Sequence, residues 1–306
     1  MLVEQTTAVA RERIGEPAGR LTPPAARGEH GIRRRPGWHK TVIGAAIVAV
    51  LLFPVYWMLL TSARTEADSA RTPPLLAPTH LNFGAYSRAV IHNAPVTDAI
   101  VNSVIIATGT MLLTLVVAVP AAYVLARRHV RFVSLALLIL LITQLLPGIA
   151  VATPLFILFK RLALLNSYVG LILADATLTV PFAILVMRPF FLRIPRDLEG
   201  AALVDGCRPL GAFLRVVLPV SRSGVVTVGA LSFLLAWGEF LFGLSLTTTN
   251  DVQPLTVALA TFSSSTGTPW NQVMAVATVF AIPIVVAFVA LQRFIVGRLT
   301  VGGIKE

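Results

Sequence analysis

Six long apolar runs constrain the fold of this chain more than any other feature of its sequence. Each run reaches or exceeds the roughly 20 residues that a helix needs to cross the hydrocarbon of a bilayer. A backbone in lipid must satisfy its own hydrogen bonds, so runs of this length predict helices. The chain is 56% hydrophobic and only 13% charged, as expected for a protein with several spans. We therefore predict an all-α, polytopic membrane protein with six transmembrane helices, over residues 41–62, 99–126, 132–158, 168–191, 223–246 and 273–296.

The distribution of basic residues predicts the orientation of these helices. If the N-terminus is cytoplasmic, only five of the 25 Lys and Arg residues lie on the outer side: Arg64, Arg71, Arg88, Lys160 and Arg161. The positive-inside rule therefore places both termini in the cytoplasm. The net charge of +11 is then explained by basic residues that lie at the cytoplasmic surface of the membrane. We therefore expect lipid, and no nucleic acid, as a partner.

Composition also divides the chain into domains. Residues 1–40 are rich in Arg, Pro and Gly and poor in aromatic residues, so they cannot bury enough apolar surface to fold. We expect a disordered cytoplasmic tail there. Residues 41–306 should form the transmembrane domain, which ends in a cytoplasmic C-terminal tail at 297–306.

A charged segment, residues 193–222, separates the fourth and fifth predicted spans and carries a helical pattern. Pro195 suits a first helical turn, Asp197 and Glu199 favour a helix N-terminus, and Gly206 is a natural stop. These residues predict a short helix over residues 196–204.

The centre of this helix is built from small residues, Gly200, Ala201 and Ala202, which would let another protein's surface approach the backbone. A second helix should open at Pro209, and Pro219 should mark a change of direction. The segment is either a docking device or an ordinary amphipathic helix at the membrane surface.

The order of residues in this segment resembles the cytoplasmic coupling loop of the permease subunits of ATP-binding-cassette importers. The pattern of that family is Glu-Ala-Ala, three residues, Gly, nine residues and an aliphatic-x-Leu-Pro. In this chain Gly200 replaces the Glu, and the nearest acid is Glu199. The resemblance implies that the residues that couple this chain to an ATPase are Glu199, Gly200, Ala201, Ala202, Asp205, Gly206, Leu218 and Pro219.

The resemblance extends beyond the coupling loop to residues 236–246, which are similar to the fifth span of maltose-type permeases. It implies the transmembrane domain of a type I importer in the bacterial inner membrane, with a sugar or oligosaccharide as solute. The implied partners are a second, similar permease, two ATPase subunits and an extracytoplasmic solute-binding protein. The implied ATP and Mg²⁺ are bound by the ATPase subunits, and this chain needs no cofactor.

Polar residues at membrane depth are costly, so those present should face protein or a water-filled path. The sequence suggests that Gln144, Asp175 and Glu239 line a solute path, with Asn102 nearby and Trp237 offering a flat face to a sugar ring. The alternative is that these side chains satisfy each other or a partner subunit, or lie near the lipid headgroups.

The sequence lacks the motifs of an enzyme or a metal protein. It holds no G-x-x-x-x-G-K-[ST] phosphate-binding loop, and its five His residues show no metal-ligand spacing. No catalytic arrangement of Ser, His and Asp is evident. We therefore expect neither catalytic nor metal-binding residues.

Three other functions compete with sugar import. The same type of importer could carry glycerol phosphate or another polyol. A secondary transporter could instead move protons through Asp175 or Glu239, although no inverted repeat is evident. A membrane scaffold without transport would not need the polar residues in its spans.

Overall fold

The computed structural model describes residues 38–77, 80–127, 132–262 and 268–296, and all regular secondary structure in these ranges is helical. The predicted C-terminal tail, residues 297–306, lies outside the described residues, as does the predicted N-terminal tail up to residue 37. The last three residues of that predicted tail form the first turn of α1 (Trp38–Ser62), because no Pro or Gly interrupts the helix there.

The chain divides into two units, residues 1–51 and 52–306. The described part of the first unit is the N-terminal half of α1, where every side chain is exposed and most are apolar. A helix that is apolar on all sides suits a lipid environment.

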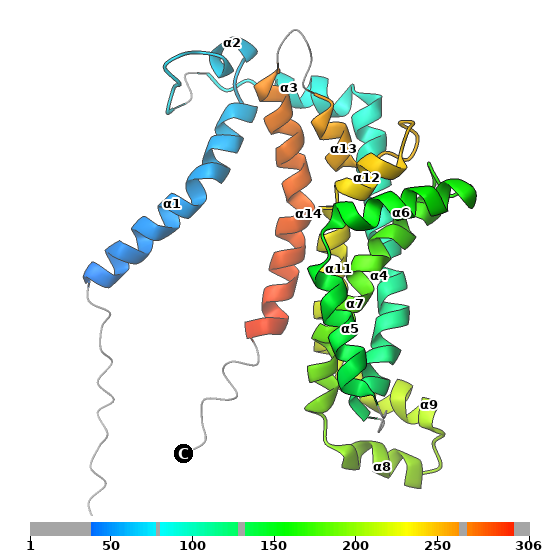
Figure 1. Ribbon diagram of the computed structural model, residues 1–306. Helices are drawn as coiled ribbons and strands as arrows, with labels where there is room; N and C mark the ends of the chain where they lie inside the picture. Colours follow the sequence, from blue (N-terminus) through cyan, green and yellow to red (C-terminus); the bar gives the residue numbers. More distant parts are fainter. Residues whose placement is uncertain (1–37, 78–79, 128–131, 263–267, 297–306) are drawn as a thin grey trace, which may run out of the picture. The chain divides into compact units, whose positions relative to one another are not determined.

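The second unit is organised around three helices, α4 (Ala94–Arg127), α7 (Tyr168–Leu192) and α11 (Arg222–Trp237), which pack side by side (Figure 1). Ala118, Ala122 and Ala126 form a stripe on α4 that is buried with Ala183 and Met187 of α7. Small residues let helix backbones approach closely in a membrane. The stripe therefore serves packing inside this chain.

Within the residues that the structure describes, four helices are long and apolar enough to cross a membrane: α1, α4, α7 and α14 (Trp270–Val296). Two bent helix pairs raise the number to six if each pair counts as one span. Several further short elements lie in the connecting segments, among them α2 (Glu66–Ser69), α3 (Gly84–Tyr86), the π-helical turn η1 (Ser87–Ile91) and α13 (Leu255–Ala260).

The third predicted span, residues 132–158, is not one straight helix. It consists of α5 (Val133–Leu145) and α6 (Gly148–Arg161), whose axes differ by 94°. Pro147 lies at the break in an extended conformation and has no N–H to continue the helix. The second half of the third span therefore runs nearly at right angles to the first.

The fifth predicted span, residues 223–246, is also broken. Its α11 ends at Trp237, and the chain starts again as α12 (Leu241–Leu246). On the other side, α11 is preceded by α9 (Pro209–Ala212), the π-helical turn η2 (Phe213–Val217) and α10 (Leu218–Val220), which meet it at 79°. This turn lies just after Pro219 and confirms the predicted change of direction.

Candidate functional site

The predicted short helix between the fourth and fifth spans is confirmed as α8 (Arg196–Val204). Pro195 is its N-cap residue, and Asp197 and Glu199 lie in its first turn, where they complement the helix dipole. Figure 1 shows α8 beyond the ends of α4, α5 and α7, at one end of the bundle.

The C-terminal end of α8 depends on Gly206, whose φ of +85° lies in the left-handed region. The N–H of Gly206 donates to the carbonyl of Leu203 at 3.1 Å, and the N–H of Cys207 donates to the carbonyl of Ala202 at 3.0 Å. This pair of hydrogen bonds is the Schellman arrangement, in which glycine ends a helix without strain. Gly206 therefore fixes where α8 stops.

The centre of α8 is open. Gly200 and Ala201 are exposed, and a Cβ added at Gly200 would meet no heavy atom within 4 Å. Val204 is 88% exposed and Leu203 is 43% exposed, so the helix also presents apolar side chains. Only Ala202 is buried and only Glu199 is half-buried, and these two fix the face on which α8 rests.

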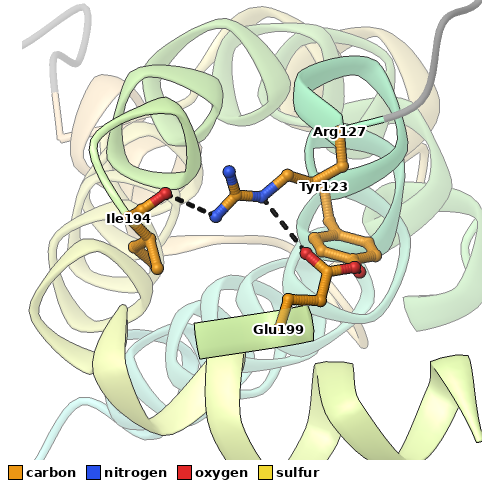
Figure 2. A network of polar contacts seen from close by, with 4 residues as sticks. All are labelled: Tyr123, Arg127, Ile194 and Glu199. Atoms are coloured by element: carbon orange, nitrogen blue, oxygen red, sulfur yellow. Dashed lines mark hydrogen bonds and ion pairs between the residues drawn. The ribbon is translucent and has the colours of Figure 1, made fainter. Parts of the chain in front are cut away.

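Glu199 is held by residues of α4 (Figure 2). Arg127 Nε lies 3.4 Å from Glu199 Oε2, and the Tyr123 hydroxyl donates to Glu199 Oε1. Arg127 also donates from a terminal nitrogen to the carbonyl of Ile194 at 2.7 Å. Neither α4 residue was predicted as a site residue from the sequence. The available signal was their spacing of four, with Tyr123 in the last turn of the predicted second span and Arg127 directly after it.

The other predicted coupling residues lie at the end of α8 or beyond it. Asp205 is the exposed C-cap of α8, whereas Leu218 and Pro219 lie in α10. Leu218 packs against the core cluster shared by α4, α7 and α11, and Pro219 is exposed. The residues of the predicted coupling pattern thus lie on the short helix α8, just after it, and in the turn that leads into α11.

Three of the predicted path residues meet at one cavity of about 310 Å³. Asp175 is 3% exposed, and within the described residues no group donates a hydrogen bond to its carboxylate. Gln144 donates from its amide to the carbonyl of Leu178 at 3.2 Å. The full lining is Gln144, Leu146, Gly148, Asp175, Leu178, Thr179, Phe182, Leu235, Ala236 and Glu239.

Glu239 has a structural task in addition to lining the cavity. Its carboxylate accepts the backbone N–H groups of Phe242, at 2.9 Å, and Gly243, at 3.1 Å. These are N–H groups at the start of α12, which have no partner within that helix. Glu239 therefore caps the N-terminal end of α12, where the helical structure begins again after the break that follows α11.

Asn102 and Trp237 do not line this cavity. Asn102 donates to the carbonyls of Asp251 and Gln253, both at 3.1 Å, and accepts from the Tyr168 hydroxyl at 2.6 Å. It therefore ties α4 and α7 to the segment that follows α12.

Trp237 is 2% exposed and stacks between Phe233 and Phe280. Its indole N–H donates to the carbonyl of Phe280 at 3.1 Å. Its ring is therefore occupied by protein. Among the residues that the structure describes, no group of three His, Cys, Asp or Glu side chains could hold a metal ion.

Comparisons with known proteins identify the family. The family described as binding-protein-dependent transport system inner membrane component matches residues 118–301. The sulfoquinovosyl glycerol transport permease of Agrobacterium fabrum is 36% identical over 86% of this chain and 92% of its own. The trehalose transport permease of Mycobacterium tuberculosis is 36% identical over 90% of this chain and 99% of its own.

A solved structure agrees at the level of the fold. A chain of a bacterial ATP-binding-cassette transporter involved in the import of alginate has a TM-score of 0.73 at 22% identity, covering 84% of this chain and 95% of that one. The chain thus belongs to the family of inner membrane components of binding-protein-dependent transport systems.

Proposed function

We propose that this chain is the permease subunit of an ATP-driven importer for a sugar or oligosaccharide, and that α8 is its docking helix for an ATPase. The observation that carries the proposal is the open, small-residue centre of α8, with Gly200 and Ala201 exposed beside Val204. Exposed apolar side chains on a segment outside the spans favour a protein partner. No phosphate-binding loop occurs in the chain, so ATP and Mg²⁺ are assigned to that partner.

The solute class rests on the relatives. Their printed names include permeases for sulfoquinovosyl glycerol, trehalose and diacetylchitobiose, all of which are carbohydrates or carry one. A carbohydrate presents many hydroxyl donors, and the cavity lined by Asp175, Gln144 and Glu239 offers acceptors for them. We assign the solute path to this cavity.

The assembly follows from the same proposal. A second permease completes the passage, two ATPases engage the docking helices, and a solute-binding protein delivers the sugar on the outer side of a bacterial inner membrane. An ATPase can drive the bundle only if its contact energy with α8 differs between the inward-open and outward-open conformations. Docking on a helix that can move with the bundle meets this requirement.

Reconstitution tests the proposal. The chain is co-expressed with a candidate second permease, ATPase and binding protein from the same genome, and the purified complex is placed in proteoliposomes with labelled trehalose, diacetylchitobiose or glycerol 3-phosphate. We expect ATP-dependent uptake of at least one of the two sugars, and a protonophore should not reduce this uptake. Uptake that follows a proton gradient without ATP, or of glycerol 3-phosphate alone, would contradict it.

The proposed orientation predicts a labelling pattern. In a Cys207→Ser background, Val204→Cys should react with a membrane-impermeant maleimide in inside-out vesicles and not in right-side-out vesicles, because Val204 is 88% exposed on α8. Leu76→Cys, at a position that is 69% exposed in the predicted outer segment, is the matched control and should show the opposite pattern. Labelling of Val204→Cys from the outside would overturn the docking role.

A further inference from the structure

The helix α8 is joined to the bundle at few points. Of its side chains only Ala202 is buried and only Glu199 is half-buried, and the two are one turn apart on the same face. Ala202 offers a small apolar contact. Glu199 is therefore the one charged side chain on α8 that is directed toward the bundle, where its carboxylate meets α4 (Figure 2).

The partners of Glu199 come from one face of α4. Tyr123 and Arg127 are four residues apart, so their side chains lie one above the other. The side chain of Arg127 is 7% exposed and that of Glu199 is 20% exposed, so water screens this ion pair only partly. One carboxylate oxygen of Glu199 accepts the Tyr123 hydroxyl, and the other faces Arg127. Both oxygens of Glu199 therefore have a partner on α4.

The same α4 residues are fixed to α7 and to the turn before α11. Arg127 donates to the carbonyl of Ile194 just after α7, and Arg188 of α7 donates to the carbonyl of Leu125 of α4 at 3.2 Å. The Tyr123 ring packs on Phe213 of η2, with centroids 4.6 Å apart. A displacement of Glu199 would therefore act on α4, α7 and η2 together.

We propose that Glu199, Arg127 and Tyr123 form the joint that passes displacement of α8 to the paired helices α4 and α7. This inference rests on the proposed docking of an ATPase on α8, and it assigns Glu199 a positioning role that does not involve the ATPase surface. Gly200, at the centre of α8, is exposed and has open space around it, whereas Glu199 next to it turns inward. Gly200 therefore belongs to the proposed docking surface, whereas Glu199 links α8 to α4.

Three variants test the joint in the reconstituted complex. Glu199→Ala and Arg127→Ala should each lower the number of solute molecules moved per ATP hydrolysed by about tenfold, the range expected when a coupling residue is lost. Tyr123→Phe keeps the ring against Phe213 and removes the hydroxyl, so it should give a smaller loss of the same ratio. Asp98→Ala, which removes an exposed acid from the opposite end of α4, should leave the ratio unchanged.

The double variant supplies a second criterion. If Glu199 and Arg127 act as one joint, the double Ala variant should lose no more coupling than either single variant, because contacting residues are not additive. Multiplied losses would overturn the joint. A purely structural contact would have a different effect: the variants would reduce the amount of assembled complex, but each remaining complex would transport the wild-type amount of solute per ATP. That result would also overturn the joint. Failure of the proposed function is seen separately, as wild-type protein without ATP-dependent uptake.

Discussion

Replacing Gly206 with proline should abolish solute uptake while the chain still inserts into the membrane. Gly206 has a φ of +85°, and the proline ring fixes φ near −65°, so the native turn cannot form. Proline also removes the N–H that donates to the carbonyl of Leu203. Both losses fall at the C-terminal end of α8, outside the spans. The measurement is uptake by proteoliposomes, with membrane-inserted chain determined on a blot.

Gly206→Ala is the graded control. A Cβ at this position would meet no heavy atom within 4 Å, so the substitution adds no clash and only the left-handed backbone is disfavoured. That conformation costs about 1–2 kcal/mol for a residue with a Cβ. Uptake should therefore fall partially. Wild-type uptake by the proline variant at normal abundance would contradict the role of α8 in docking.

Ala201→Trp tests the same surface from the other side. Ala201 is exposed at the centre of α8, so an indole there should occupy the space that a docked ATPase needs without disturbing the bundle. We expect loss of uptake and loss of ATPase co-purification, whereas Ala201→Ser should retain both. Retained ATPase binding by the tryptophan variant would place the docking surface elsewhere.

Features set by neighbouring residues could be predicted from the sequence. Pro195, the acids after it and Gly206 specify α8 because caps and stops act within one turn. The four long spans followed from apolar length alone. The size of the bend at Pro147 could not be predicted, since a proline in an apolar run can produce either a mild kink or the 94° turn between α5 and α6.

Long-range partners explain the mixed outcome at the polar residues. Gln144, Asp175 and Glu239 converge on one cavity, as the cost of burying polar groups in lipid suggests. Asn102 was assigned to the same path, yet its amide partners are the carbonyls of Asp251 and Gln253, about half the chain length away. No local pattern encodes such a pairing. Arg127 was counted only as one more cytoplasmic charge for the same reason.

Asp175→Asn should lower solute uptake by up to about tenfold, which corresponds to losing about 1.5 kcal/mol from a hydrogen bond to the solute. The substitution preserves shape and replaces one acceptor oxygen by an amide donor at a side chain that is 3% exposed, lines the cavity and receives no hydrogen bond within the described residues. A carboxyl oxygen at this position can accept hydroxyl donors from a passing carbohydrate. Initial uptake rates over a range of sugar concentrations give the measurement.

The neighbouring positions provide the controls that make this result specific. Thr177→Ala alters an exposed residue on the same helix, where the hydroxyl donates only to the carbonyl of Ala174, and uptake should remain at the wild-type level. Glu239→Gln should lower the abundance of the complex as well as uptake, because Glu239 also accepts the N–H groups of Phe242 and Gly243. Asp175 has no such structural task, so its loss should reduce uptake at unchanged abundance. Wild-type uptake by Asp175→Asn would show that sugar passes without contact to this cavity.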